Sequence, residues 1–407
     1  MISTSGRRAG RALLAAARRA SGVLVARPPP ARPFREGTFT SRVHHERVAA
    51  VLGIALGVAF TVCFATGLLS DQIQQPQSWF AWPARPRDLY RWTQGAHVVT
   101  GVATIPLLLA KLWTVYPRLW SWPPVRSLAH AVERAALVPL VGGALLLLLT
   151  GLQNVFYWYP TPFFFTTTHY WTAWITVGAL VIHVGAKTTV AAAALRNPPP
   201  PRPDGSAAAV DRRRFLATVA AATSIVALNY LGQVVSPLRV LAVLTPRRSD
   251  AGSQGVPVNK DARTAGVVEA ASDPGFRLRV HGAVARPLTL DLDQLRTRAK
   301  HEVDLPIACV EGWSVGARWR GVPVRALLAE AGAAGFREVV VRSLQRKGPY
   351  TGSRLNRAHA LDPDTLLALD LNGAPLDLDH GYPMRLIAPN NPGVMQTKWV
   401  ASLEVLA

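Results

Sequence analysis

Four long and predominantly apolar segments constrain the fold of this chain more than any other feature. They lie at residues 48–69, 96–116, 135–157 and 169–195. Each is long enough to cross the hydrocarbon core of a bilayer as a helix. A fifth segment, 215–235, is less apolar because Asn229 and Gln233 interrupt it. The pattern predicts an all-α transmembrane four-helix bundle followed by one anchor helix.

The basic residues indicate how these helices are oriented. The chain carries 45 Lys and Arg against 24 Asp and Glu. The arginines flank the apolar segments and do not form one face, which favours membrane orientation and gives no expectation of nucleic-acid binding. With a cytoplasmic N-terminus, most of the basic residues beside the membrane segments up to Arg214 lie inside, and only Arg85, Arg87 and Arg91 lie outside. We therefore expect a multi-pass protein of the cell membrane, with everything after residue 236 on the periplasmic or extracellular side.

The segments outside the four spans differ strongly in composition. Residues 1–41 are rich in Arg, Ala and Pro and lack the apolar core of a secretory signal, so they read as a disordered cytoplasmic extension, with a transit peptide as the alternative. The expected order is this extension (1–41), a membrane domain (42–196), a Pro-rich linker (197–211), an anchor helix (212–236), a polar tether (237–265) and a separate domain (266–407).

The anchor begins with the stretch DRRRFLATVA at residues 211–220. Arg212–Arg214 followed by Phe215 and Leu216 resembles a twin-arginine (Tat) signal, the kind that exports folded proteins already carrying a cofactor. No cleavage site follows, so we expect an uncut anchor. The alternative is that these arginines only mark the cytoplasmic end of the helix.

Histidines within the apolar segments are costly and therefore suggest a function. His169 and His183 are 14 residues apart, roughly 21 Å and nearly a whole number of helical turns, so they share a face near opposite membrane surfaces. His97 is level with His169, and His44 (or His45, with His44 preferred) is level with His183. Two such pairs suit the axial ligands of two hemes, although interfacial histidines bonded to backbone or water are the alternative. Small residues that would admit the ring are Gly95, Gly101, Gly178 and Gly185.

This ligand spacing and helix order over 44–195 resembles the diheme cytochrome b subunits of bacterial formate dehydrogenases and nickel-iron hydrogenases. The resemblance implies two heme b groups and electron exchange with the quinone/quinol pool.

From residue 275 the pattern changes to short alternating strands separated by short helices, which predicts a mixed α+β domain. Within it, the stretch LPIACVEGWSVGARWRGVP at 305–323 places Cys309 at the end of an apolar strand. Such a cysteine can be a core residue, a nucleophile or a soft metal ligand. The only other cysteine, Cys63, lies in a membrane segment, so no disulfide framework is expected.

Residues 276–407 resemble the molybdenum-cofactor domain of the sulfite oxidase superfamily. The Cys-Val-Glu-Gly-Trp-Ser stretch is especially similar to periplasmic methionine-sulfoxide reductases. The resemblance implies that Cys309 binds molybdenum and is the catalytic residue. It also implies a molybdenum–molybdopterin cofactor bound by Asn259, Ser343, His380, Arg385, Gln396, Thr397 and Lys398.

The turn after Cys309 departs from animal sulfite oxidases, in which it contains an arginine, and the immunoglobulin-like domain of those enzymes does not follow Lys398. We therefore expect reduction of a methionine-sulfoxide-like sulfoxide, small or protein-bound, with electrons from quinol. One alternative is a sulfite dehydrogenase that reduces quinone. Another is a heme-only electron carrier with a docking domain. Two interpretations stay open for a set of four arginines: they line an anion site, or they are ordinary surface charges. The set is Arg318, Arg320, Arg346 and Arg354.

Overall fold

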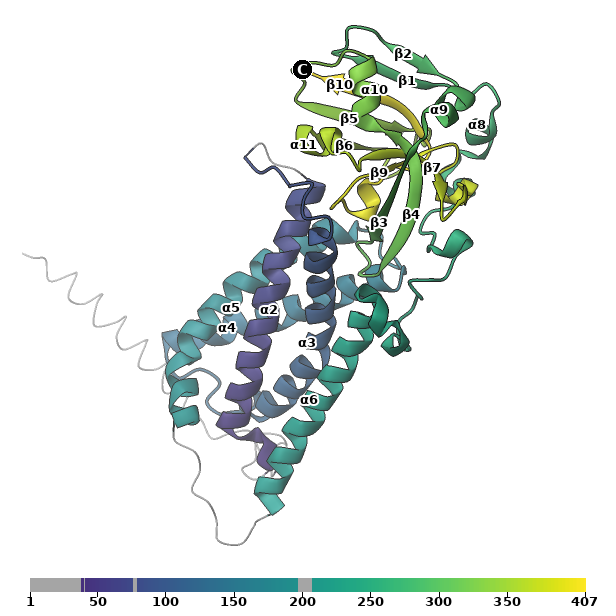
Figure 1. The fold of residues 1–407 in the computed structure, drawn as a ribbon. Helices are drawn as coiled ribbons and strands as arrows, with labels where there is room; N and C mark the ends of the chain where they lie inside the picture. Colours follow the sequence, from purple (N-terminus) through teal and green to yellow (C-terminus); the bar gives the residue numbers. More distant parts are fainter. Residues whose placement is uncertain (1–37, 40, 76–78, 197–206) are drawn as a thin grey trace, which may run out of the picture. The chain divides into compact units, whose positions relative to one another are not determined.

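The computed structural model describes residues 38–39, 41–75, 79–196 and 207–407 (Figure 1). The expected extension (1–41) and linker (197–211) lie largely outside these residues. The chain forms two compact units. The first consists of residues 1–60, 103–153 and 159–224, and the second of residues 61–102, 154–158 and 225–407.

The described residues contain five helices long and apolar enough to cross a membrane. They are α2 (Glu46–Gln74), α3 (Leu89–Leu119), α4 (Leu128–Val155), α5 (Phe165–Arg196) and α6 (Ala207–Val234). The expected set of apolar helices is confirmed, while a bundle of four stays a prediction. The helix α3 begins at Leu89, so His97 lies about two turns inside it and not at its start.

Helix contacts in the first unit use small side chains. Ala144 packs with Leu56 and Leu108, and a Cβ on Gly143 would lie 2.1 Å from the Thr176 Oγ1 atom. Close approach at small residues is how helices associate in a lipid environment, where apolar surface alone gives no preference for another helix. Many remaining apolar side chains are exposed, among them Val138 and Val181. This distribution suits helices whose outer faces meet lipid.

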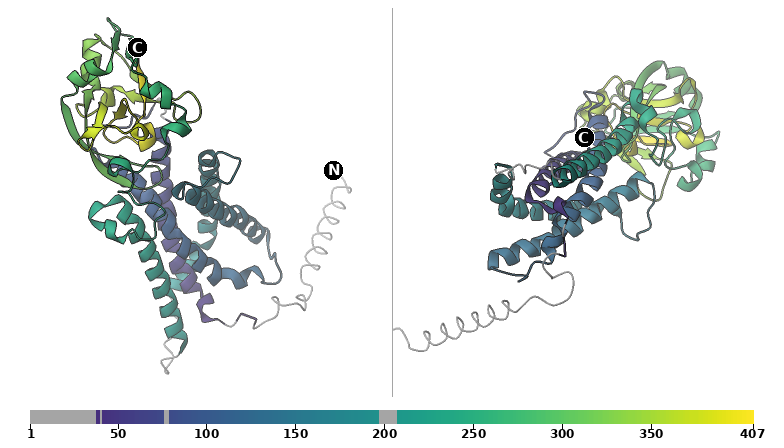
Figure 2. Two further views of the ribbon diagram at one scale, coloured as in Figure 1. Left: turned by 90° about the vertical axis from the view of Figure 1, so that its right-hand side faces the viewer. Right: turned by 90° about the horizontal axis from the view of Figure 1, so that it is seen from below.

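The second unit contains a mixed α+β domain, drawn in green to yellow in Figures 1 and 2. One sheet has the strand order β2-β1-β10-β5-β6, and the other has the order β3-β4-β7-β8 with β9 also paired to β7. Only β1 and β10 pair in parallel within these ladders. The strands are β1 (Leu278–Gly282), β2 (Leu288–Leu290), β3 (His301–Ala308), β4 (Ser314–Pro323), β5 (Glu338–Ser343), β6 (Gly352–Asn356), β7 (Leu366–Leu371), β8 (Ala374–Pro375), β9 (Arg385–Ile387) and β10 (Val400–Leu406).

Short helices and turns complete this domain. The α-helices are α7 (Ala262–Ala265), α8 (Val268–Ser272), α9 (Leu292–Arg298), α10 (Val324–Glu330) and α11 (Arg357–Leu361). The 3₁₀ turns η4 (Leu378–His380) and η5 (Gly393–Met395) flank β9. The expected mixed α+β class is confirmed.

Alternation along the strands builds two cores. In β4, Val315, Ala317 and Trp319 are buried and the residues between them are exposed, as a period of two requires. Trp319 belongs to a core that also contains Cys309. The other core joins residues of the first sheet to residues of β7 and β9, and α10 adds Val324, Leu327 and Leu328 to it at helical spacing.

The expected tether at 237–265 needs a correction, because its last part is packed on this domain. Val256 is fully buried in the core that contains Cys309. The Gln254 side chain donates to the carbonyl oxygens of Leu371 and Pro375 at the β7–β8 turn. The polar composition suggested a solvent-exposed tether. The polar groups instead form hydrogen bonds with backbone atoms of the domain and do not face solvent alone.

Candidate active site

Cys309 lies in a tight turn between β3 and β4. Its N–H donates to the Trp313 carbonyl at 2.9 Å, and the Gly312 N–H donates to the Cys309 carbonyl at 3.0 Å. Gly312 has a φ of 94°, which favours glycine, and a Cβ there would lie 2.7 Å from Val98 of α3. Cys309 is 2% exposed. The turn therefore holds one buried sulfur atom in a fixed place.

Two hydrogen bonds reach the Cys309 sulfur. The Asn259 side-chain amide donates to it at 3.0 Å, and the Glu311 N–H donates at 3.5 Å. Burial, and then the nearby Glu311 carboxylate, raise the pKa of the Cys309 thiol. The sulfur is therefore a protonated thiol in the absence of a cation, and a bound metal would favour its thiolate form.

Glu311 and Arg247 are parts of this site that the sequence reasoning missed. The Trp313 indole donates to the buried Glu311 carboxylate at 2.9 Å, and Arg247 lies 3.6 Å from the same oxygen atom. Burial nevertheless raises the pKa of Glu311. Arg247 also donates to the Asn259 side chain at 2.8 Å, so it orients the amide that meets the sulfur. Glu311 belongs to the Cys-Val-Glu-Gly-Trp-Ser stretch, whereas no sequence motif marks Arg247 as a site residue.

A second part of the site is a pair of cationic side chains, the buried Arg385 and the half-buried Lys398. Arg385 is 4% exposed, and Lys398 donates to the carbonyl oxygens of Lys260 and Asp379 at 2.9 and 2.7 Å. Among the described residues, neither cation has a carboxylate oxygen within ion-pair distance. Burial lowers the pKa of Arg385 to about 10, and burial together with Arg385 lowers the pKa of Lys398 to about 7. Two neighbouring desolvated cations without a carboxylate partner favour an anionic ligand.

Gly381 keeps the space between these cations open. Its φ is 112°, and a Cβ there would lie 3.1 Å from Lys398 Cβ and 3.2 Å from Arg385 Cβ. His380 is fully buried beside it, with its Nε2 atom 2.7 Å from the Ser253 carbonyl. Several buried polar atoms nearby have no hydrogen-bond partner among the described residues, namely His380 Nδ1, Arg385 Nε, Asn391 Nδ2 and Gln396 Oε1. Buried polar atoms are normally paired, so this set fits a polar, anionic group such as molybdopterin.

The remaining residues of the expected cofactor set lie in the same region. A bridge from Ala308 to Pro392 brings the segment 391–398 beside the Cys309 turn. The Thr397 hydroxyl lies 2.7 Å from that of Ser353. Ser343 donates to the Lys398 carbonyl at 2.8 Å and so supports the backbone of a cofactor residue.

The four arginines that formed a candidate anion site in the sequence lie outside the Cys309 site. Arg318, Arg320 and Arg354 form ion pairs with carboxylates on the exposed faces of the sheets. Arg346 is exposed in the turn after β5. The three arginines in ion pairs are therefore surface charges.

The turn that bears Cys309 also receives two donors from the apolar helices, and the sequence reasoning missed both. Gln94 of α3 and Asn154 of α4 each donate to the Val310 carbonyl at 2.9 Å. Gln94 and Asn154 belong to no recognisable sequence motif. Only their polarity within apolar helices distinguishes them in the sequence.

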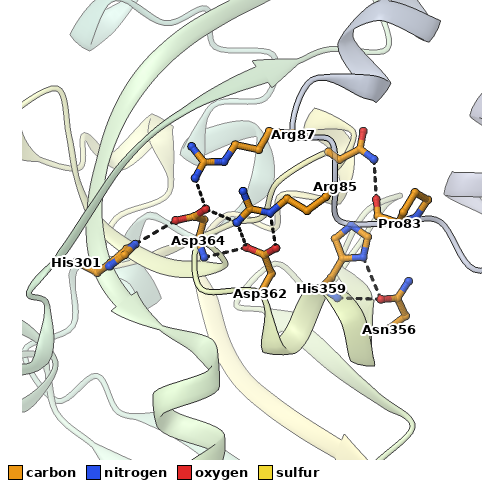
Figure 3. A network of polar contacts seen from close by, with 9 residues as sticks. Pro83, Arg85, Arg87, His301, Asn356, His359, Asp362 and Asp364 are labelled. Atoms are coloured by element: carbon orange, nitrogen blue, oxygen red, sulfur yellow. Dashed lines mark hydrogen bonds and ion pairs between the residues drawn. The ribbon is translucent and has the colours of Figure 1, made fainter.

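A charged network fixes the segment before α3 to the same domain (Figure 3). Arg85 makes a two-pronged contact with Asp362 at 2.9 and 3.0 Å and reaches Asp364 at 2.5 Å. Arg87 also contacts Asp364 at 2.5 Å, and His301 lies 3.3 Å from its other oxygen. Both carboxylates are buried, so the arginines compensate charges that would otherwise be costly.

Asn390 forms a second connection in this region. Its amide nitrogen donates to the Pro83 carbonyl at 2.6 Å, and its amide oxygen accepts from the Tyr90 N–H at 2.6 Å. The Trp82 indole donates to the Asn390 carbonyl at 2.8 Å. Residues 82–90 are therefore hydrogen-bonded to the segment that precedes Gln396 and Lys398.

Three of the histidines expected to bind heme have their Nδ1 atom engaged. His97 contacts the Cys63 carbonyl at 2.8 Å, and His169 contacts the Thr150 hydroxyl at 2.8 Å. His44 contacts the Thr114 carbonyl at 3.1 Å. A contact at Nδ1 orients an imidazole to bind a metal through Nε2. The same contacts agree with the alternative of histidines bonded to backbone, so heme ligation stays a prediction. The alternative, His45, has its Nδ1 engaged by the Arg47 N–H.

The glycines beside these rings differ partly from those expected. A Cβ on Gly67 would lie 2.8 Å from His97, and one on Gly151 would lie 3.8 Å from His169. Gly95 faces Val234 and Gly101 faces Cys63. A Cβ at Gly178 or Gly185 would meet no described atom within 4 Å, so both positions leave space beside α5.

Comparison with known proteins agrees with the geometry of the Cys309 domain. Residues 265–407 match the family model "Oxidoreductase molybdopterin binding domain". Sulfite oxidase of Gallus gallus is 34% identical over 167 residues, covering 34% of this chain and 36% of that protein. The catalytic subunit of a protein-methionine-sulfoxide reductase, MsrP of Gluconobacter oxydans, is 33% identical over 149 residues, covering 32% and 47%.

A third relative is the putative protein-methionine-sulfoxide reductase subunit YedZ1 of Azospira oryzae. It is 34% identical over 138 residues, covering 34% of this chain and 50% of that protein. The chain thus spans between about a third and a half of the length of these three relatives. Residues 265–407 are thus similar to molybdopterin-binding oxidoreductase domains, among them those of sulfite oxidases and of a protein-methionine-sulfoxide reductase, and indicate a molybdenum-dependent oxidoreductase.

Proposed function

We propose that the protein is a membrane-bound molybdenum oxidoreductase that reduces a sulfoxide on the outer face, with electrons drawn from quinol through b-type hemes. The observation that carries the proposal is the buried Cys309 sulfur in one domain with two cations, the buried Arg385 and the half-buried Lys398, that lack a carboxylate partner among the described residues. A domain that only docked to a partner would gain nothing from such costly groups. This argues against the heme-only alternative.

The chain's own residues would divide the work of holding the cofactor. Cys309 would bind the molybdenum, and Asn259 would donate to its sulfur. Arg385 and Lys398 would neutralise the phosphate, while His380 and Gln396 would meet the polar edges of the pterin. When bound, this group supplies oxygen-atom transfer coupled to a change of two electrons. The burial of Cys309, His380, Arg385 and Gln396 limits the access of water to the reacting centre.

The membrane helices would supply the electrons one at a time. We assign His97 with His169 to an outer heme b and His44 with His183 to an inner one. The engaged Nδ1 atoms of three of these rings support the assignment. On α3, His97 follows Gln94 by one helical turn, and Gln94 contacts the turn that bears Cys309. The same helix therefore offers a short path between a heme ligand and the molybdenum site.

The charged network supports an outer location for the catalytic domain. The orientation rule places the loop with Arg85 and Arg87 outside the cytoplasm. The buried carboxylates of Asp362 and Asp364 bind these same two arginines, so domain and loop belong on one side. The anchor α6, with its twin-arginine-like start, would deliver the folded domain there.

The direction of electron flow is the finer part of the proposal. The turn after Cys309 carries Glu311 and no arginine, which disfavours a site built around a sulfite dianion. A sulfite dehydrogenase that reduces quinone is the second candidate, favoured by the identity to sulfite oxidase of Gallus gallus.

The test is turnover of methionine sulfoxide by membranes containing the full chain, compared with the Cys309→Ser variant. The hemes provide an internal control, because Cys309 does not touch any of the four histidines. We expect the variant to lose at least a hundred-fold in rate (about 3 kcal/mol) with an unchanged heme spectrum. Unimpaired turnover in Cys309→Ser would refute the proposed catalytic role.

A further inference from the structure

The peptide group that joins Val310 to Glu311 is bonded at both ends. Its carbonyl oxygen accepts from the side chains of Gln94 and Asn154, both at 2.9 Å. Its N–H, which belongs to Glu311, donates to the Cys309 sulfur at 3.5 Å. One peptide therefore lies between two amides from apolar helices and the sulfur that is expected to bind molybdenum.

Hydrogen bonds in such a chain strengthen one another. Two donors at the carbonyl oxygen polarise the peptide, and its N–H becomes a better donor. A donor to a metal-bound thiolate withdraws charge from the metal centre and raises its reduction potential. The second donor to this sulfur, the Asn259 amide, comes from outside the helices. The peptide is therefore the route by which α3 and α4 can act on the sulfur.

The two amides are well placed to act as fixed donors. Gln94 is 5% exposed, and the packing of Val98 against Gly312 brings the same helix against the turn. Asn154 comes from a different helix and reaches the same oxygen atom. If the carbonyl only required a partner, one donor would satisfy it. The buried Gln94 and the half-buried Asn154 together occupy both lone pairs of this carbonyl oxygen, so the whole polarising effect on the peptide comes from the two helices.

We propose that Gln94 and Asn154 are positioning residues that set the reduction potential of the molybdenum centre through the Val310–Glu311 peptide. This inference rests on the proposed function, because it requires molybdenum on Cys309. It adds a direct influence of the electron-carrying helices on the oxygen-transferring centre. The reduction potentials of the electron donor and of the molybdenum centre would thereby be matched within one chain.

The test uses the full-length protein loaded with its cofactor, in the variants Gln94→Met, Asn154→Leu and the double variant. Gln74→Met is the matched control, since the Gln74 amide lies at the end of α2 and bonds to Ser70. Three quantities are measured: the molybdenum content, the midpoint potential of the molybdenum from its paramagnetic signal, and the coupling of that signal to an exchangeable proton.

We expect all variants to retain molybdenum. The midpoint potential should fall in each single variant and fall further in the double variant, and the exchangeable-proton coupling should weaken in the same order. Heme potentials and the Gln74→Met variant should match the unaltered protein.

An unchanged molybdenum potential in the double variant would overturn the inference. An equal shift in Gln74→Met would overturn it as well, because the effect would then be general. Loss of molybdenum from either single variant would show that the amides only fold the turn. Absence of molybdenum from the unaltered protein would instead reject the proposed function, so the two failures are distinguishable.

Discussion

Replacing Arg385 by Met should have opposite effects on the cofactor-free and the cofactor-loaded protein. Arg385 is nearly fully buried, stands over the Trp319 ring and has no carboxylate partner among the described residues. Methionine keeps a long flexible side chain against the same ring but carries no charge. The variant therefore isolates the cost of the cation from the loss of packing.

The magnitude follows from the lowered pKa of Arg385. Its pKa falls from 12.5 to about 10, and one unit corresponds to about 1.4 kcal/mol, so the charged form costs about 3 kcal/mol when no anion is bound. The weak contact from Arg385 to the His380 carbonyl, at 3.4 Å, offsets about 1 kcal/mol of this. The cofactor-free variant should be more stable by about 2 kcal/mol. Cofactor binding should weaken by about 3 kcal/mol, roughly a hundred-fold.

The assay is thermal and denaturant unfolding of the full chain in detergent, produced in hosts with and without molybdopterin synthesis. Arg318→Met is the matched control, because Arg318 forms an exposed ion pair with Asp304. It should leave both forms unchanged within about 0.5 kcal/mol. A cofactor-free Arg385→Met protein that is less stable than the parent, or one that keeps its cofactor, would refute the reasoning about an anion cradle.

Three further predictions concern the other charged and metal-binding groups. In the cofactor-free protein, Lys398 loses its proton near pH 7 while the unfolded chain keeps it to about 10.5, so stability should rise with pH above 7 more steeply in the parent than in Lys398→Met. Arg85→Met should cost about 2 kcal/mol by removing charged hydrogen bonds from Asp362 and Asp364; a stability equal to that of Arg318→Met would contradict the network's role. His97→Ala and His183→Ala should each halve the heme content of purified protein, whereas an unchanged content in either would remove that residue from the ligand set.

Most of the architecture could be predicted from periodicity and composition. The apolar helices follow from long runs without charge, and the α+β domain follows from short alternating strands such as β4. Helix ends were less predictable. The helix α3 starts at Leu89 because its first turns pack against the Cys309 domain, as the hydrogen bond from Tyr90 to Asn390 shows, and no local pattern encodes such a distant contact.

The candidate site was predictable only where one motif carried it. Cys309, Arg385 and Lys398 stood in recognisable stretches, and the structure places them in one domain. Arg247, Gln94 and Asn154 come from segments far away in sequence and meet the site through single hydrogen bonds. The segment 253–262 looked like a tether because it is polar, yet its polar groups pair with backbone atoms of the domain.

The most direct test of the central claim is an optical difference spectrum of the hemes in membranes that contain the full chain. The hemes are first reduced by a quinol, and methionine sulfoxide is then added without oxygen. The account predicts that the hemes are oxidised, and that those of Cys309→Ser stay reduced. Absence of a b-type heme spectrum, or hemes that stay reduced in the unaltered protein, would contradict it.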